Sequence, residues 1–327
     1  MAARPEVPGL HHVTAITGDA PGNVAFYRRV LGLRLVKKTV NQDDVSAYHL
    51  FYGDARGSPG MDLTFFDWPG ATPNVPGTGT VAGVGLAVPD TSALRWWADR
   101  FERLGVAHGP VGERRGRAAL SFTDPEGQRL ELVDGSGLPG PETRRWADGP
   151  VPEEVAIRSF FGVTLDTAVP GPTVALLTGL LGFRQEEALE EGGRPVAVLR
   201  CGAGGAGSEV VVRASGTRRG VPGRGGVHHV AFRTADDASQ RAWLALVQAA
   251  RIPNSGIVDR YYFRSLYFRE PGGVLFEIAT DGPGFATDEA PEHLGEALAL
   301  PPFLEPRRAE IEAGLRPLAT AAEPAGA

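Results

Sequence analysis

The stretch HHVTAIT (11–17) returns far downstream as HHVAFRT (228–234), so two similar segments each open on a pair of histidines. Polar and apolar side chains alternate in both stretches, which is the pattern of a strand with one buried face. The two pairs hold four of the seven histidines in the chain. The sequence therefore predicts equivalent strands and a shared role for the two pairs.

A glutamate follows the second histidine pair at the end of the same segment. Glu277 lies in GGVLFEIA (272–279), between Phe276 and Ile278. An ionised carboxylate on an otherwise apolar strand is costly to bury unless a cation compensates its charge. Two imidazoles and one carboxylate form a ligand set that holds a redox-active iron and leaves coordination positions open. A metal site is the favoured hypothesis, and purely structural histidines are the alternative.

An internal repeat organises the chain. A shift of 150 residues places HHVTAIT over FGVTLDT (161–167), and a shift near 145 places VGLAVPD (84–90) over HHVAFRT. Each copy begins with a strand, continues with a helical stretch and returns through short strands. The helical stretches are clearest at 19–32 and 91–105. The sequence therefore predicts an α+β fold of four βαβββ units, at about 8–68, 80–134, 157–214 and 225–281.

The boundaries between these units suggest a division of the chain. Gly and Pro are frequent in 135–156, which predicts a linker between two halves. Residues after 282 leave the repeat, with a helix expected near 304–316 and a frayed tail over the last nine residues, ATAAEPAGA. The predicted parts are an N-terminal domain of two units (1–140), a C-terminal domain of two units (155–282) and a C-terminal extension (283–327).

Composition restricts the location and the partners of the protein. The net charge of −6 does not favour nucleic acid or an anionic membrane surface. No apolar run approaches the ~20 residues that span a bilayer, and the N-terminus lacks the apolar stretch of a signal peptide. Cys201 is the only cysteine, so no intrachain disulfide can form. A cytoplasmic protein without nucleic-acid or membrane partners is expected.

The repeated units serve as internal controls for the metal hypothesis. His12 in unit one corresponds to Gly162 in unit three, and His229 in unit four corresponds to Gly85 in unit two. The glutamate of unit four has a counterpart in Glu131, but no histidine accompanies it. The ligand set is therefore complete only if units one and four face each other. Units two and three are expected to form a site without a metal.

Within each pair we favour the second histidine, His12 and His229. Successive side chains point to opposite faces of a strand, so the two members of a pair are not expected to enter one cavity. The first histidine of each pair shares its face with a valine, Val13 or Val230, which is typical of a packing position. This alternation favours the second member of each pair as the ligand.

The chain resembles the vicinal oxygen chelate superfamily. The resemblance covers about 8–281 and rests on HVTAITGDAPGNVAFYRRVLGLRLV (12–36), DPEGQRLEL (124–132) and EPGGVLFEI (270–278). It implies that the four βαβββ units form two curved half-barrel sheets with outer helices.

Within that superfamily, VKKTVNQDD (36–44) and DRYYFRSLYFREPGGVLFEIATDGPGF (259–285) look most like ring-cleaving dioxygenases of the hydroquinone 1,2-dioxygenase type. The resemblance implies Fe(II), with Mn(II) as an alternative, and a small aromatic diol and O2 as reactants. A homo-oligomer is compatible with this resemblance. The residues to which it assigns roles are His12, His229 and Glu277 as metal ligands, Arg260 and Tyr267 at the substrate, and His11 and His228 as supporting groups that relay protons.

Two other functions remain open at the level of the sequence. An isomerase or thiol transferase of the same architecture, with Zn²⁺, Ni²⁺ or Mn²⁺, would need a second acid opposite Glu277. Thr64 stands at the expected position, although Asp62 or Asp67 could take that role in a shifted alignment. The second alternative is a module that sequesters a small molecule without chemistry.

Overall fold

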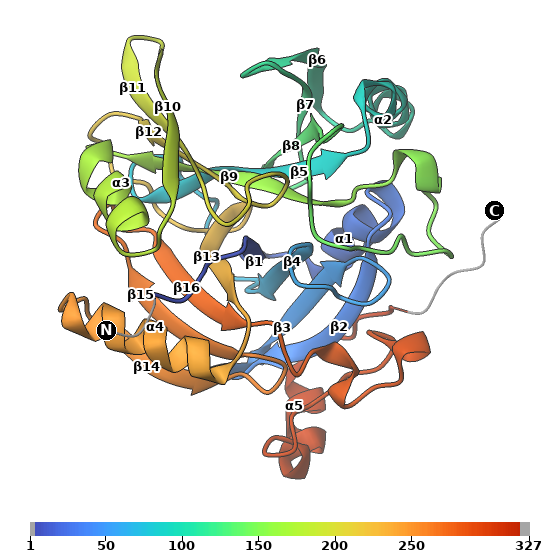
Figure 1. Ribbon diagram of the computed structural model, residues 1–327. Coiled ribbons are helices and arrows are strands. Elements are labelled where there is room, and N and C mark those ends of the chain that lie inside the picture. Colours follow the sequence, from blue (N-terminus) through green and yellow to red (C-terminus); the bar gives the residue numbers. More distant parts are fainter. Residues whose placement is uncertain (1–3, 321–327) are drawn as a thin grey trace.

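The computed structural model describes residues 4–320, which form two curved sheets of eight strands each (Figure 1). The strand order is β14-β15-β16-β13-β1-β4-β3-β2 in the first sheet and β10-β11-β12-β9-β5-β8-β7-β6 in the second. The strands of the first sheet are β1 (Leu10–Thr17), β2 (Arg34–Asn41), β3 (Asp44–Gly53), β4 (Asp62–Asp67), β13 (Gly226–Thr234), β14 (Asn254–Asp259), β15 (Arg264–Arg269) and β16 (Leu275–Thr280). Those of the second are β5 (Thr80–Val88), β6 (His108–Arg114), β7 (Arg117–Thr123), β8 (Arg129–Asp134), β9 (Ser159–Thr167), β10 (Arg184–Glu191), β11 (Arg194–Arg200) and β12 (Glu209–Ala214).

The strand order confirms the predicted repeat and the way in which its units combine. Units one and four form the first sheet, and units two and three form the second. Antiparallel pairing of β1 with β13 joins the units of the first sheet, and pairing of β5 with β9 joins those of the second. Each half-barrel sheet therefore takes one unit from either side of the 135–156 segment.

The helices lie on the outside of the sheets (Figure 1). The predicted helix 91–105 is observed as α2 (Thr91–Leu104), which begins after the N-cap Asp90 and ends at Gly105 in the left-handed region. The predicted helix 19–32 is split into α1 (Ala20–Ala25) and a π-helical turn, η1 (Phe26–Val30). The other long helices are α3 (Pro170–Gly179) and α4 (Asp237–Ala249). None of the helices in residues 4–320 has the length and apolar character needed to cross a membrane.

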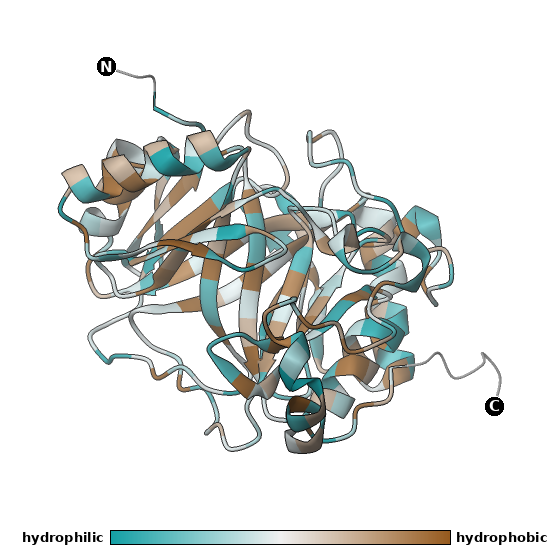
Figure 2. Ribbon diagram, turned by 90° about the horizontal axis from the view of Figure 1, so that it is seen from below, coloured by the Kyte–Doolittle hydropathy of each residue, from teal (hydrophilic) through white to brown (hydrophobic). Residues whose placement is uncertain are grey.

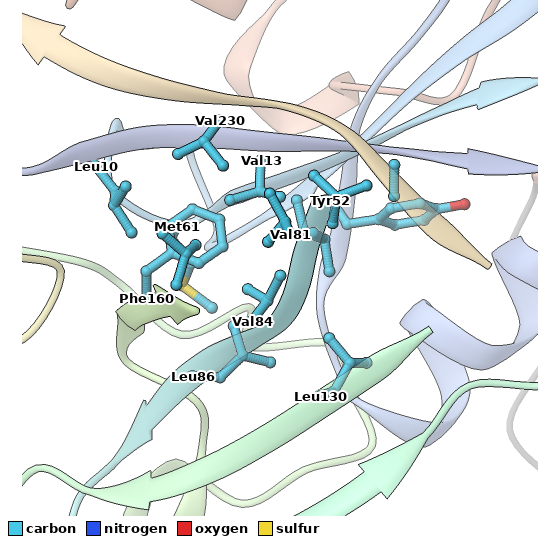
Figure 3. Packing of buried hydrophobic residues seen from close by; sticks show 14 of the residues in the cluster. Leu10, Val13, Tyr52, Met61, Val81, Val84, Leu86, Leu130, Phe160 and Val230 are labelled. Atoms are coloured by element: carbon cyan, nitrogen blue, oxygen red, sulfur yellow. The ribbon is translucent and has the colours of Figure 1, made fainter. Parts of the chain in front are cut away.

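The faces where the two sheets meet form the main hydrophobic core (Figure 3). Val13 of β1 and Val230 of β13 point into this core, as the sequence predicted for the residues beside the histidines. They meet Val84 and Leu86 of β5 and Phe160 of β9 from the second sheet. The hydropathy colouring in Figure 2 shows apolar residues along the strands, whereas the helices mix polar and apolar residues. The opposite face of β1 and β13 is thereby left for the site.

The C-terminal extension folds back onto the first sheet. Its helical part is shorter than the predicted 304–316, since it consists of a 3-10 turn, η5 (Glu305–Arg307), and α5 (Arg308–Gly314). The last seven residues of the predicted frayed tail lie outside the described part of the chain. The 135–156 segment is irregular, as expected for a linker, except for a 3-10 turn, η2 (Glu153–Val155).

A buried ion cluster attaches the extension to β2. The ammonium group of Lys37, which is fully buried, contacts the carboxylates of Asp288 and Glu289, and its distance to Asp288 Oδ1 is 2.7 Å. The hydroxyl of Tyr262 donates a hydrogen bond of 2.7 Å to Asp288. The Lys37 ammonium also lies 4.7 Å from the centre of the Tyr262 ring. Because a buried ammonium without a partner is strongly unfavourable, this extension is part of the folded unit.

The double substitution Asp288→Asn with Glu289→Gln is expected to lower the free energy of unfolding by about 3–5 kcal/mol, because it leaves the buried Lys37 charge uncompensated. Urea denaturation measures this change. Adding Lys37→Met to the double variant should restore most of the loss. Glu312→Gln, which removes an exposed partner of Arg308, is the control and should change stability by less than about 0.5 kcal/mol. Equal effects of the double variant and the control would contradict the assignment.

Candidate metal centre

Three buried side chains of the first sheet converge on one point. They are His12 of β1, His229 of β13 and Glu277 of β16, and they are the one such group of potential metal ligands among residues 4–320. The Nε2 atoms of His12 and His229 lie 3.2 Å apart. Glu277 Oε2 lies 3.1 Å from Nε2 of His12 and 2.9 Å from Nε2 of His229. The group joins units one and four, as the repeat analysis predicted.

The pairing register explains how the three side chains meet. His12 lies opposite Ala231 on β13, and Ala231 lies opposite Glu277 on β16. His229 is two residues before Ala231 on the same strand and so faces the same side of the sheet. The three potential ligands therefore surround the small, fully buried side chain of Ala231. A methyl group at this central position leaves room above it for an ion.

Irregularities in pairing let both members of a histidine pair approach the site. Between the partners Leu10↔Phe232 and His12↔Ala231, β1 advances by two residues while β13 advances by one, so His11 is an extra residue. His228 is the corresponding extra residue on β13. The prediction that strand alternation keeps the two members of a pair out of one cavity is therefore wrong for His228 and His229, which both line the cavity described below, whereas only His12 of the first pair lines it. A bulge suspends the alternation locally and turns the extra side chain towards its neighbour.

The first histidine pair fixes the tautomer of His12. His11 Nδ1 lies 2.9 Å from His12 Nδ1, and His11 Nε2 lies 3.1 Å from the carbonyl oxygen of Thr280. Burial, and next the neighbouring His12, lower the pKa of His11 to about 3, so its imidazole is neutral at pH 7. Its one N–H donates to the carbonyl, and its Nδ1 accepts from Nδ1 of His12. Nε2 of His12 is then left with a free lone pair that points at the ligand group.

The second histidine pair has the same contact but a different environment. His228 Nδ1 lies 2.8 Å from His229 Nδ1. Burial, and next the neighbouring His229, lower the pKa of His228 to about 3. Unlike His11, His228 lines the cavity described below, and the edge of its ring contacts Trp68. One member of the first pair is therefore locked to the backbone, whereas the corresponding member of the second pair faces the cavity.

Glu277 is a buried, ionised carboxylate. Burial alone would raise its pKa, but imidazoles of His12 and His229 that carry positive charge or a proton on Nε2 outweigh burial and hold the pKa well below its usual value. With both imidazole protons on Nδ1 this compensation is missing, and a bound cation would have to supply it. Neither carboxylate oxygen accepts a geometrically satisfactory hydrogen bond, although both are buried. The short contacts to the two Nε2 atoms lack a hydrogen when the imidazoles carry their protons on Nδ1. A buried anion beside two nitrogen lone pairs is a donor set that fits a cation.

The separations between donor atoms are short enough for one ion to reach all three. Ligand bonds of about 2.1 Å place neighbouring donors about 3.0–3.4 Å apart for angles between the right-angled and tetrahedral values. The observed 2.9, 3.1 and 3.2 Å lie at or near this range. The three residues could therefore hold one metal ion.

No second acid completes a four-ligand site within the described residues. Thr64 occupies the position at which a second acid was expected. Its hydroxyl lies 2.8 Å from the Thr14 hydroxyl and 3.0 Å from His49 Nε2. The carboxylate of Asp62 packs so closely against Gly53 that a Cβ on this glycine would lie 2.6 Å from Asp62 Oδ1. Asp67 forms an ion pair with Arg316. Neither aspartate belongs to the ligand group.

A cavity of about 370 Å³ opens beside the ligand group. This size and its largely aromatic wall are typical of a small-molecule site. Arg260 and Tyr267, which the sequence analysis singled out, both line it. The described residues of the wall are His12, Thr39, Val40, Asn41, Gln42, Asp43, Asp44, His49, Phe51, Phe66, Trp68, His228, His229, Arg260, Tyr262, Phe263, Tyr267 and Leu275.

Arg260 and Tyr267 form a polar chain in this wall. Arg260 Nε donates a hydrogen bond of 3.3 Å to the Tyr267 hydroxyl oxygen, and its two terminal nitrogens donate to Asp43 at 2.7 and 3.1 Å. Burial, and next the charge of Glu277, raise the pKa of Tyr267. The phenol therefore keeps its proton at pH 7. Because its oxygen accepts from Arg260, its own O–H is available to donate into the cavity.

The equivalent position in the second sheet contains an arginine, which was not predicted from the sequence. Gly85 and Gly162 face each other across β5 and β9, where the first sheet has its histidine-bearing strands. Glu131, the counterpart of Glu277, receives a contact of 2.6 Å from Arg114, which also contacts Glu209 at 2.8 Å. In this sheet guanidinium groups therefore compensate the half-buried Glu131 and the buried Glu209.

Several residues of the site were not predicted from the sequence. Ala231 and Asp43 have no distinctive sequence pattern, and Phe263, which packs 5.1 Å from His12, lies in a run of aromatic residues. The bulges at His11 and His228 also cannot be recognised in the alternation of polar and apolar residues along the strands. Only the doubling of each histidine hinted at an extra residue. The predicted ligand residues, in contrast, all meet in one place.

Comparison with known proteins places these features in context. A profile described as Glyoxalase/Bleomycin resistance protein/Dioxygenase superfamily matches residues 9–132 and 170–278. The chain is 46% identical to "Putative ring-cleaving dioxygenase MhqA" of Bacillus subtilis, over 96% of this chain and 99% of that protein. It is 34% identical to "Chlorohydroquinone/hydroquinone 1,2-dioxygenase" of Sphingobium indicum, over 95% of this chain and 97% of that protein.

Solved structures agree with the sequence comparisons. A Bacillus subtilis crystal structure described as a "putative dioxygenase" has a TM-score of 0.90 and 40% identity, and the match covers 98% of this chain and 100% of that one. A glyoxalase I mutant from Zea mays has a TM-score of 0.62 at 14% identity, covering 84% of this chain and 95% of that one. The second match shows only that the fold is shared.

His11→Phe is expected to weaken binding of a divalent metal by roughly 10–100-fold, because the acceptor that orients Nδ1–H of His12 is lost. Competition against a chromophoric chelator, with Zn²⁺ and Fe²⁺ in turn, measures this affinity. His293→Phe is the control, since His293 is exposed and lies outside the site. An unchanged affinity in His11→Phe would refute the tautomer assignment.

Asp62→Asn is expected to stabilise the protein at pH 8 by about 1–3 kcal/mol and to have little effect at pH 3. Burial, and next the charge of Asp54, raise the pKa of Asp62 well above its usual value, and neither of its oxygens has a hydrogen-bond partner. Ionisation therefore costs stability as the pH rises above about 4, the pKa of an unfolded aspartate. Thermal unfolding from pH 3 to 8 tests this, and a pH-independent difference would contradict it.

Proposed function

The chain belongs to the Glyoxalase/Bleomycin resistance protein/Dioxygenase superfamily, and we propose that it is an iron(II)-dependent ring-cleaving dioxygenase acting on a hydroquinone- or catechol-type diol. The observation that carries the proposal is the three-residue ligand group at the end of an aromatic-lined cavity. Relatives that match nearly the whole chain and are named ring-cleaving dioxygenases support the same activity.

His12, His229 and Glu277 would hold the iron. Two imidazoles and one carboxylate contribute one negative charge, and three protein ligands would leave coordination positions on a divalent ion for two reactants. Iron(II) would supply the redox chemistry by which O2 reacts with an electron-rich ring, so that both oxygen atoms enter the opened product. Mn(II) accepts the same ligands and remains an alternative.

The cavity wall would bind and orient the diol. Phe66, Phe263 and Trp68 line it and exclude water from an aromatic ring. Tyr267 would donate its O–H to a diol oxygen, since Arg260 already donates to the phenol oxygen. Its donated hydrogen bond would stabilise negative charge on that oxygen. The partly apolar wall and the directed donor together favour a small aromatic molecule that carries hydroxyl groups.

The two supporting histidines would have different roles. His11 is locked between Thr280 and His12, so it would orient the ligand and keep its own proton in place. His228 lines the cavity, and its Nδ1 accepts from Nδ1–H of His229, so its neutral ring carries a proton on Nε2 that would donate a hydrogen bond to a diol oxygen. Such a donor would stabilise negative charge on that oxygen.

The two alternatives receive less support. An isomerase or thiol transferase with a second acid would need a carboxylate where the hydroxyl of Thr64 is hydrogen-bonded to Thr14 and His49. A sequestering module would not need a buried carboxylate between two imidazoles. The geometry of the ligand group and the names of the relatives favour the dioxygenase over both.

The protein is to be purified without oxygen, loaded with Fe(II) and mixed with hydroquinone or catechol while O2 consumption is followed. We expect iron-dependent uptake of about one O2 per diol by the wild type. His12→Ala and His229→Ala should each lower the rate at least 100-fold, because the two protein ligands that remain in each variant no longer hold the iron.

His108→Ala is the matched control, because His108 begins β6 of the second sheet and should leave the rate unchanged within about twofold. Tight binding of zinc or nickel without any diol-dependent O2 uptake would favour an isomerase or transferase. Retention of activity in His12→Ala or His229→Ala would reject the proposed ligand set.

A further inference from the structure

A contact between units one and four lies at the solvent-facing edge of the cavity. The connection between β2 and β3 carries Gln42 and Asp43, and the connection between β14 and β15 carries Arg260. Asp43 accepts two hydrogen bonds from Arg260, and Gln42 Nε2 donates 2.9 Å to the Arg260 carbonyl oxygen. The two connections are thus held together directly at the edge of the site.

Arg260 is the one permanently charged cation among the described residues that line the cavity. Both of its terminal nitrogens donate to Asp43, and Nε donates to Tyr267. Its side chain is 20% exposed, whereas that of Asp43 is 72% exposed. The two terminal nitrogens of the guanidinium therefore face the Asp43 carboxylate, which lies on the solvent side. Three of its five N–H donors are thereby used, and the carboxylate of Asp43 balances its charge, so a second anion would meet no uncompensated cation at this wall.

Part of the remaining wall is unfavourable for an anionic ring substituent. Phe51, Phe66 and Leu275 are apolar, and Asp44 adds a second carboxylate near the mouth. A carboxylate on the ring of a bound diol would lose its hydration and meet like charges at close range. Alkyl or halogen substituents would lose no hydrogen bonds on entering the same wall. The cavity thus distinguishes substituents by charge.

We propose that Asp43 is a specificity-determining residue: by occupying the guanidinium of Arg260, it restricts the cavity to aromatic diols without an ionised ring substituent. This inference rests on the proposed function, since it concerns the substrate of the same site. Without Asp43, the two terminal nitrogens of Arg260 would be free to form a bidentate pair with a ring carboxylate. A protein with the same ligand group would then accept carboxylated diols.

Asp43 can be changed without disturbing the fold. Its side chain is largely exposed, and an exposed ion pair contributes little to stability. Arg260 keeps its hydrogen bond to Tyr267 in Asp43→Asn, and its backbone carbonyl keeps the hydrogen bond from Gln42. The substitution therefore isolates the charge that Arg260 faces.

The test is anaerobic titration calorimetry of the iron(II)-loaded protein with three diols that share one substitution pattern: methylhydroquinone, gentisate and gentisamide. Gentisate carries a ring carboxylate, and gentisamide is its neutral counterpart of similar size. The wild type should bind gentisate at least ~30-fold more weakly than gentisamide. Asp43→Asn should bind gentisate roughly 10–100-fold more tightly than the wild type, with less than about threefold change for the two neutral diols.

Three further variants separate charge from shape. Asp43→Glu should keep the preference of the wild type, because it retains the carboxylate. Arg260→Gln added to Asp43→Asn should remove the gained gentisate binding, because the guanidinium is absent. Glu191→Gln, which removes an exposed partner of Arg115 in the second sheet, should behave as the wild type.

The outcomes distinguish the inference from the proposed function. Binding of methylhydroquinone by the wild type, together with the gain of gentisate in Asp43→Asn, supports both. Equal affinity of the wild type for gentisate and gentisamide overturns the role of Asp43 while the dioxygenase proposal stands. If Asp43→Asn binds the neutral diols normally but still rejects gentisate, the role of Asp43 is likewise overturned and the dioxygenase proposal stands. Failure of the wild type to bind any of the three diols overturns both proposals.

Discussion

The antiparallel pairing of β1 with β13 is the interaction on which the site depends. It joins strands that are more than 200 residues apart in sequence, and it places His12 opposite Ala231, with His229 two residues before it. Without this pairing, His12 would not reach His229 and Glu277, which the pairing of β13 with β16 brings together. The inner faces of the same strands carry Val13 and Val230, so one pair of strands supports both the core and the site.

The two sheets show two ways of compensating a carboxylate at equivalent positions, half-buried Glu131 in the second sheet and fully buried Glu277 in the first. Arg114 compensates Glu131 in the second sheet, whereas Glu277 in the first sheet has two imidazoles whose protons are directed elsewhere. A guanidinium brings its own charge and hydrogens and completes a structural contact. Two nitrogen lone pairs beside the carboxylate leave it able to bind a metal cation. The second sheet therefore has a structural ion pair at the position where the first sheet has potential metal ligands.

The cavity wall is assembled from segments that are distant in sequence. The C-terminal extension supports it from behind, because Phe285 packs 4.9 Å from Phe51 and 5.5 Å from Tyr262, measured between ring centres. Lys37 fixes the same extension through a buried ion cluster. At the mouth, contacts between units one and four hold Arg260. The wall is thus rigid on its apolar side and joined by an ion pair on its polar side.

The sequence by itself determined the repeat and the fold class, because hydrophobic periodicity and residue type are local properties that repeated units preserve. It also indicated His12, His229 and Glu277 as ligands, but the choice of the second histidine in each pair rested partly on the resemblance to a known family. It could not determine the bulges at His11 and His228, since a bulge exists only relative to the partner strand. Nor could it determine that Asp43 meets Arg260, because loops from different units share no pattern. Pairing across the sheet decided these features, since only the folded chain sets the register and the distances between side chains.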